Sequence, residues 1–293
     1  MGSTSDGQAT TVDDHLFLKK DVGISIKKDS ALNLRGVDGD GWIKADPTTA
    51  EFIQVWGDLE RHGEGDVVSQ LPVLVRSGGD LHISGKNGTH SANLLIFHDG
   101  VAGTNNASLW VEDNGTVHLG TYSQNVHRGI WVSDEVVFDG GELVVRGSTV
   151  SIEASSLVRF TNDATLLMQD GSLPNSPLFT TLSILFNGPN AKVDLVNTRW
   201  FLDVKGGATP DLDVVEVYGG DLVTSQTNTG LFVTGYDTIP IGTQFDIFKV
   251  HGGQITGNFA LQSWSGPVDF DITTHTIMGA DIFRLTAKKK ANN

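Results

Sequence analysis

Residues 141–160 read GELVVRGSTVSIEASSLVRF, and this stretch indicates the fold of the whole chain. Apolar residues stand at alternate positions in short runs, as at Leu143 and Val145, which is typical of a strand with one buried face. The runs restart at Leu143, Val150 and Leu157, in steps of seven residues. Such a step accommodates a strand of three or four residues and one tight corner, and leaves no room for a crossover helix. We therefore expect short strands joined directly by corners.

The same spacing continues in both directions along the chain. The pairs are Leu81/Ile83, Leu109/Val111, Val117/Leu119, Ile130/Val132, Val136/Phe138, Leu143/Val145, Val150/Ile152, Val158/Phe160, Leu166/Met168, Leu182/Ile184, Val193/Leu195, Val215/Val217 and Leu231/Val233. Residues that supply the positive φ of tight corners separate them, at Gly78-Gly79, Asn87-Gly88, Asn114-Gly115, Gly140-Gly141, Asp170-Gly171, Gly206-Gly207 and Gly219-Gly220. We expect the pairs to face the core and intervening residues such as Arg146 to face away.

Two segments repeat one pattern. Residues 79–85 (GDLHISG) and 141–147 (GELVVRG) share it, and residues 114–120 are a looser third copy. A unit of one strand and one corner cannot bury its apolar face alone, so stacking on the next unit stabilises it. The sequence therefore predicts an all-β fold, a β-solenoid of the right-handed parallel β-helix type with N- and C-terminal caps. β-Sandwich or jelly-roll domains share the alternation and the turns, and they are the alternative.

The chain divides into three predicted zones. Residues 1–70 are less repetitive and are expected to form an N-terminal cap or attachment module, residues 71–235 the solenoid repeat body, and residues 236–293 the C-terminal capping coils and a basic tail. Helical signals are confined to the first zone. Residues 48–57 and 14–20 are the two candidates for a short helix that caps this end.

Composition excludes several classes of protein. Of 293 residues, 39% are hydrophobic and 19% charged, so the chain can bury a core, and it contains no cysteine. With 35 acidic and 20 basic residues the formal charge is -15, which repels nucleic acid and anionic membranes. No run approaches the roughly 18 consecutive apolar residues of a membrane span. We expect neither nucleic-acid binding nor membrane insertion.

The last zone resembles the end of autotransporter passenger domains and related bacterial surface β-helix proteins. The shared features are a Gly-x-x-Phe-x-Ile strand at 242–247, a Gly-x-Phe turn at 257–259 and a closing apolar strand at 282–285. The resemblance implies a β-helix end cap and an adhesive or structural role at a surface. The repeat body resembles phage tail spikes, fibres and capsid-decorating proteins, which are made without a leader. The sequence shows no leader-like apolar stretch in residues 1–11 and no translocator barrel after Ala287, which favours the phage class.

Four residues are candidates for facing a ligand. His82 and His118 occupy the middle of matching predicted strands, so both should point away from the core. Stacked histidines can bind a metal or a sugar, but no third ligand follows at a fixed spacing, and ordinary surface histidines are the simpler interpretation. Trp110 and Trp131 can stack on sugars if they are exposed, although an aromatic side chain more often fills a core or an interface.

Acidic residues suggest neither a calcium site nor a catalytic pair. Asp38-Gly39-Asp40-Gly41 resembles the opening of a calcium loop, but the fifth position is Trp42 and the twelfth is Thr49, so we interpret it as an acidic turn. Glycan hydrolysis needs two carboxylates roughly 5 to 10 Å apart in a groove. The acids that could face one are Asp134, Glu135, Glu153, Asp163, Asp203, Asp211, Asp213 and Glu216. Outward acids also keep a solenoid soluble, so we predict no catalytic residue, metal or cofactor.

These observations favour a non-enzymatic structural or receptor-binding component of a surface assembly. The leading expectation is a tailed-phage virion protein, either a tail spike or fibre or a capsid decoration. An extracellular autotransporter-like adhesin at the cell surface and a polysaccharide-degrading β-helix enzyme are the alternatives. Expected partners are other virion or surface-assembly proteins and a host cell-surface glycan. Because the ends of a solenoid leave strand edges that pair with other chains, we also expect a homo-oligomer, with a trimer favoured.

Overall fold

The computed structural model describes most of the chain, mainly the strands and the corners that adjoin them. The described residues are 9–12, 15–18, 24–26, 31–36, 41–45, 53–56, 58–63, 65–69, 72–85, 92–96, 108–120, 128–146, 149–169, 179–205, 211–224, 229–236, 239–257, 259–264 and 268–290. Within these ranges the protein is all β and no helix occurs. A search of the same residues for a helix long and apolar enough to cross a membrane finds none.

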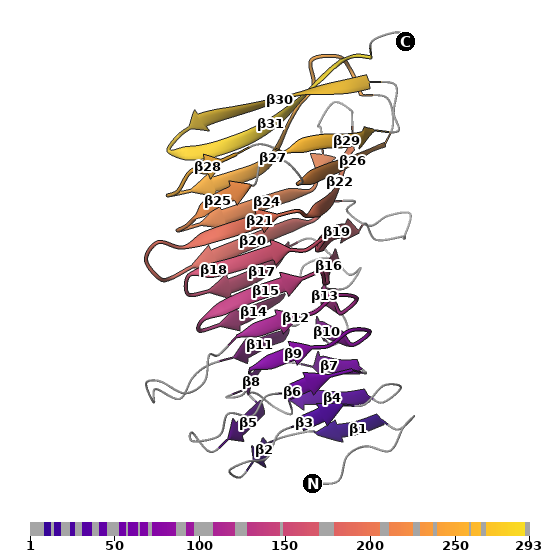
Figure 1. Ribbon diagram of the computed structural model, residues 1–293, viewed down its shortest axis with the longest axis vertical. Coiled ribbons are helices and arrows are strands. Elements are labelled where there is room, and N and C mark those ends of the chain that lie inside the picture. The colour runs from indigo at the N-terminus through magenta and orange to yellow at the C-terminus, as the bar shows by residue number, and fades with distance from the viewer. Residues whose placement is uncertain are drawn as a thin grey trace.

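The strands form three sheets, and consecutive strands enter the three sheets in turn (Figure 1). Sheet A contains β1 (Ala9–Val12), β4 (Ala31–Gly36), β7 (Asp58–Gly63), β10 (Asp80–Gly85), β13 (Thr116–Gly120), β16 (Glu142–Arg146), β19 (Thr165–Gln169), β22 (Arg199–Lys205), β26 (Gly230–Tyr236) and β29 (Ala260–Trp264), with β23 (Asp211–Leu212) antiparallel to β22. Sheet B contains β2 (His15–Leu18), β5 (Gly41–Ala45), β8 (Gly65–Ser69), β11 (Ala92–Ile96), β14 (Arg128–Val132), β17 (Thr149–Ala154), β20 (Thr181–Phe186), β24 (Val214–Tyr218), β27 (Gln244–His251), β31 (Ala280–Lys289) and β30 (Val268–Ile277). Sheet C contains β3 (Ile24–Ile26), β6 (Ile53–Val55), β9 (Val73–Val75), β12 (Leu109–Val111), β15 (Glu135–Asp139), β18 (Leu157–Thr161), β21 (Lys192–Val196), β25 (Asp221–Thr224) and β28 (Ile255–Thr256).

Pairing within the body of each sheet is parallel, and the register fixes the length of one coil. Glu142 of β16 pairs with Thr165 of β19, so this coil takes 165 − 142 = 23 residues. Asp80 of β10 pairs with Thr116 of β13, and that coil takes 116 − 80 = 36 residues. The added residues lie between strands, and the strands on both sides remain in register. Parallel sheets built from many short strands agree with the predicted solenoid and are unlike the antiparallel sheets of the sandwich alternative.

The predicted core pairs face inward. Every member of the pairs named above is buried, and none is more than 3% exposed, so the prediction for Val145 and Ile152 is confirmed. One detail differs, because Leu157 lies just after the corner and the next residue, Val158, is the buried one. Aromatic rings continue the core from coil to coil: Phe138 stacks on Phe160 at 4.6 Å between ring centroids, and Phe160 meets Trp200 edge-on at 5.5 Å.

The Gly-Gly corners have two distinct requirements. Gly78 has a φ of 76°, which side-chain-bearing residues rarely adopt, and Asn114 fills the equivalent role in the next coil at 57°. Gly79 must lack a side chain, because a Cβ there would lie 2.1 Å from the carbonyl oxygen of Val55 in the preceding coil. The predicted corners at Gly140 and Gly219 also have positive φ. Those predicted at 87–88, 170–171 and 206–207 lie outside the described residues.

The repeated segments occupy equivalent places. β10, β13 and β16 are neighbours in sheet A, with Asp80, Thr116 and Glu142 aligned in register. The sequence repeat therefore corresponds to one strand and corner of each successive coil, as stacking requires.

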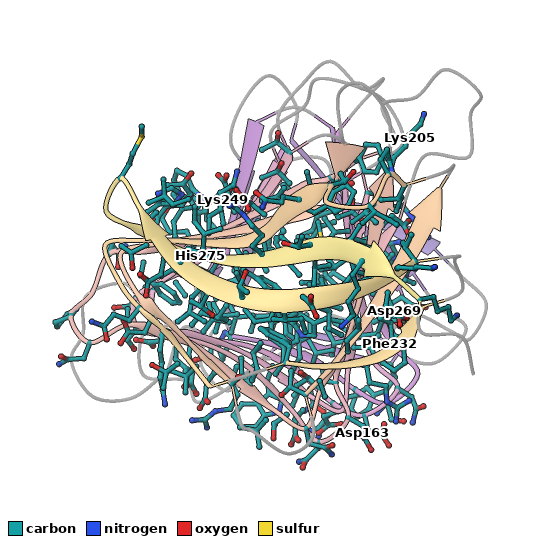
Figure 2. All side chains as sticks on the ribbon, turned by 90° about the horizontal axis from the view of Figure 1, so that it is seen from above. Asp163, Lys205, Phe232, Lys249, Asp269 and His275 are labelled. Carbon is teal, nitrogen blue, oxygen red and sulfur yellow. The ribbon has the colours of Figure 1, made fainter. Side chains whose placement is uncertain are left out.

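An antiparallel hairpin ends sheet B at the C-terminal end. β31 pairs with β27 and β30 pairs with β31, both antiparallel. Viewed along the stack, the hairpin lies across its end (Figure 2). Phe283 of β31 is fully buried and meets the rings of Phe248 and Phe259 edge-on, at 5.6 and 5.1 Å. The hairpin thus covers apolar rings that the last coil would otherwise expose.

The two helical candidates are wrong where the structure describes them. Residues 15–18 form β2 and residues 53–55 form β6, and both strands pair with the next coil. Isolated strands of this length are weak, so pairing with the neighbouring coil outweighs the local helical signal. The divisions predicted at residues 70 and 235 stay predictions.

Candidate functional site

The structure places the four candidate residues on three different faces. His82 and His118 lie on the outer face of sheet A, Trp110 on that of sheet C and Trp131 on that of sheet B. Trp110 and Trp131 are 38% and 37% exposed. Only the two histidines come together. In Figure 2, the labelled Phe232 of sheet A and Lys249 of sheet B are on different sides of the stack.

The histidines form a pair across two coils. His82 of β10 and His118 of β13 are direct partners in the parallel register, and their rings stack with centroids 4.3 Å apart and planes 4° from parallel. Asp80 stands two residues before His82 on the same face, and its Oδ1 lies 3.7 Å from Nε2 of His118. We call Asp80, His82 and His118 the histidine cluster. Their potential ligand atoms all lie within 4.8 Å of one another, which is close enough for the group to hold a metal ion.

Partial burial keeps His118 neutral. Loss of solvent, the neighbouring His82 and the guanidinium of Arg146 together lower the pKa of His118 from 6.5 to about 4, against the opposing effect of Asp80. Its Nδ1 is buried and has no hydrogen-bond partner among the residues that the structure describes. Nearby, burial and then the charge of Asp80 raise the pKa of Glu142. The face therefore carries a neutral imidazole with a lone pair available at pH 7.

Acid should weaken the fold through His118. Above pH 6.5 the ring is neutral in both states, and between pH 6.5 and about 4 the unfolded chain binds a proton that the folded chain does not. We expect this to lower the free energy of unfolding by about 1 to 2 kcal/mol between pH 7.5 and pH 5. The raised pKa of Glu142 has the opposite effect on the free energy of unfolding. Glu142 is present in every variant compared, so this effect cancels in the comparison. Urea denaturation in a chelator at both pH values measures the difference.

Two variants isolate this contribution. His118→Gln should reduce the pH-dependent loss by most of that amount, because glutamine does not titrate. His275→Gln is the matched control, since His275 is an exposed histidine of β30 whose Nε2 contacts the Thr273 hydroxyl. Equal pH dependence in His118→Gln and in the unaltered protein would contradict the assignment.

Sheet B carries a different outer surface. Parallel register aligns one residue from each of six successive coils on the outward side of the strands, and we call this set the sheet B ladder: Leu95, Trp131, Glu153, Leu185, Tyr218 and His251. Leu95 is itself buried. Tyr218 is exposed and stacks on His251 with ring centroids 4.5 Å apart. The Tyr218 hydroxyl donates a 2.6 Å hydrogen bond to Glu216, and this bond, burial and the carboxylate charge raise the pKa of Tyr218 to about 12. The phenol is thus fixed in its protonated form.

Two of the acids considered for hydrolysis, Asp213 and Glu216, have structural roles. Asp213 is buried, and its two oxygens accept hydrogen bonds from the backbone N–H groups of Thr180 and Asp203. Burial favours the neutral form of Glu216, but hydrogen bonds from Tyr218 and Lys249 outweigh it and lower the pKa. A general acid needs the opposite shift. Residues 38–40 of the acidic turn lie outside the described part of the chain.

Sequence reasoning overlooked Asp80 as a third member of the histidine cluster. The signal was present, because an outward residue two positions before His82 shares its face. It was missed because a search for ligands at fixed spacings along the sequence does not detect a contact between coils whose register differs by 36 residues.

Comparison with known proteins finds no family model that matches this sequence and no curated protein that matches it significantly.

Proposed function

We propose that this chain is a right-handed parallel β-helix that serves as a non-enzymatic structural or receptor-binding component of a surface assembly. The leading case is a tailed-phage virion protein, either a tail spike or fibre or a capsid decoration. Three features support this proposal: the parallel pairing of each strand with its counterpart one coil later, the continuous aromatic core and the capping hairpin. Such a scaffold presents long, regular faces to partners.

The sheet B ladder is the observation that carries the receptor-binding part. Trp131 and Tyr218 are exposed on one face, three strand steps apart, which corresponds to about 14 Å. Their flat rings offer apolar area at little cost in side-chain entropy. Glu153 and Leu185 lie between them in the register. An elongated host cell-surface glycan that follows the stack can contact both rings, so we propose this face as its binding surface.

Glycan binding tests this part of the proposal. Purified bacterial capsular and O-antigen polysaccharides are immobilised, and binding of the protein is measured by biolayer interferometry. We expect Trp131→Ala and Tyr218→Ala each to weaken binding to the recognised polysaccharide at least about tenfold. Trp110→Ala removes an equally exposed tryptophan from sheet C and should leave binding within about twofold. Equal loss in all three variants, or no polysaccharide bound, would contradict a binding surface on sheet B.

The same assay separates binding from hydrolysis. We propose that the bound polysaccharide stays intact, because the carboxylates of Asp213 and Glu216 are occupied by hydrogen bonds. Reducing ends are measured after prolonged incubation. Their release, if a single Asp or Glu substitution abolished it, would establish the polysaccharide-degrading alternative instead.

Association with other chains is part of the proposal. Partners are other virion or surface-assembly proteins, and the chain itself is proposed to form a homo-oligomer, with a trimer favoured. β30 is an edge strand of sheet B, and Ile241, Ile277 and Met278 are exposed apolar residues of the last coil and hairpin. Light scattering of the isolated protein tests this, and a monomer at every concentration would contradict self-association. If the protein comes from a bacterial surface and not from a virion, the autotransporter-like adhesin becomes the preferred assignment.

A further inference from the structure

We propose that Asp80, His82 and His118 bind one divalent transition-metal ion of the zinc type, and that the ion ties two neighbouring coils together. Two ligands come from β10 and the third from β13, so the site exists only when the coils are stacked in register. The proposal is independent of the receptor role, since sheet A and the sheet B ladder are different faces.

The spacing of the ligand atoms suits a shared ion after a small movement. The three potential ligand atoms lie within 4.8 Å of one another. Zinc ligands at about 2.0 to 2.1 Å in a tetrahedron stand about 3.4 Å apart, so the widest gap must close by at most about 1.4 Å. Rotation of half-buried side chains on an outer face can provide this without moving the backbone. The two rings are stacked and nearly parallel, so their in-plane lone pairs do not yet converge, and binding requires the rings to rotate out of the stack.

The donor set selects the kind of ion. Two imidazole nitrogens and one carboxylate oxygen suit zinc and its neighbours nickel, copper and cobalt, whereas calcium and magnesium prefer oxygen ligands alone. Nε2 of His118 lies 3.7 Å from Oδ1 of Asp80, which is longer than an ordinary hydrogen bond. Three protein ligands leave a fourth position for water or for a group from a partner.

The position of the cluster gives the ion a structural effect. The coil between Asp80 and Thr116 takes 36 residues, compared with 23 between Glu142 and Thr165. A longer coil loses more chain entropy when its ends are brought together, and the binding free energy of an ion across its base offsets part of that loss. An ion that binds the folded protein and not the unfolded chain raises the melting temperature, and the rise continues with the logarithm of the free ion concentration above the Kd.

The test uses the full chain, with Zn²⁺ alone as the thermodynamic probe and Co²⁺ as the spectroscopic one. We expect calorimetry to give one Zn²⁺ per chain, micromolar Zn²⁺ to raise the melting temperature, and bound Co²⁺ to show the visible absorption of a four-coordinate site. His82→Gln, His118→Gln and Asp80→Asn should each weaken Zn²⁺ binding at least about tenfold and abolish the Co²⁺ band. His275→Gln, an exposed histidine outside the cluster, should change neither.

Each outcome decides the proposal. Circular dichroism and the metal-free melting temperature first establish that the variants fold, and any that does not is replaced by alanine at the same position. Zn²⁺ binding that survives in all three cluster variants would show that other histidines hold an adventitious ion only, and would overturn the proposal. A Co²⁺ band lost in the cluster variants and retained in His275→Gln supports it.

Discussion

Val193→Asp is expected to unfold the protein, or to lower its free energy of unfolding by more than about 4 kcal/mol. Val193 lies in β21 and is 0% exposed, between Val158 of the preceding coil and Leu222 of the following one in the same inward row. An aspartate there would place a carboxylate among apolar side chains with no partner for its charge. Urea denaturation followed by circular dichroism measures the loss, and a chain that fails to fold at all also meets the expectation.

Val196→Asp is the matched control. It makes the same change in the same strand, but Val196 is 40% exposed and faces outward. Solvent can hydrate the new carboxylate, so the free energy of unfolding should change by less than about 1 kcal/mol. Similar losses in the two variants would mean that the inward and outward faces of β21 have been assigned wrongly.

The second large effect concerns the capping hairpin. Phe283→Ala should lower the free energy of unfolding by about 3 to 5 kcal/mol, because it removes a fully buried ring that contacts Phe248 and Phe259. Coils contact only their neighbours, so the loss should be greatest near this end of the stack. Hydrogen exchange read by mass spectrometry should show faster exchange in β27 and β31, with β16 and β17 much less affected.

Ile277→Ala is the control within the same hairpin. Ile277 is exposed near the hairpin turn, so its truncation creates no cavity and should change stability by less than about 1 kcal/mol. Uniform acceleration of exchange along the whole chain in Phe283→Ala would show that the stack unfolds as one cooperative unit and not coil by coil.

The sequence was sufficient to predict which residues face the core. Alternation at Leu143 and Val145 depends only on the two-residue period of a strand, and this period does not change from coil to coil. The repeat shared by residues 79–85 and 141–147 likewise placed equivalent strands in one sheet. Short helices were predicted wrongly because β2 and β6 owe their conformation to pairing with other coils, which a local window of sequence does not contain.

The candidate site was harder to predict for a related reason. Which outward residues share a face depends on the sheet that each strand enters, and therefore on the number of strands per coil. Trp110 and Trp131 are close in sequence and similarly exposed, yet they belong to sheets C and B. His82 and His118 are further apart in sequence and touch. The matching repeat positions of His82 and His118 predicted that they share a face. The assignment of Trp110 and Trp131 to different faces follows only from the three-sheet topology.

The constancy of the register makes the corner after sheet A a natural place for grafting foreign sequence. Residues 147–148 are all that separate β16 from β17, whereas residues 170–180 separate β19 from β20, and the strands on both sides still pair with their partners. Coil length at this corner is therefore uncoupled from the stacking that supports the fold. A peptide epitope or a small binding loop introduced after Arg146 would be displayed beside sheet B, and the coil that carries it would determine its position along the stacking axis. Several such insertions in successive coils would form an array with the spacing of the strands, about 4.8 Å per coil.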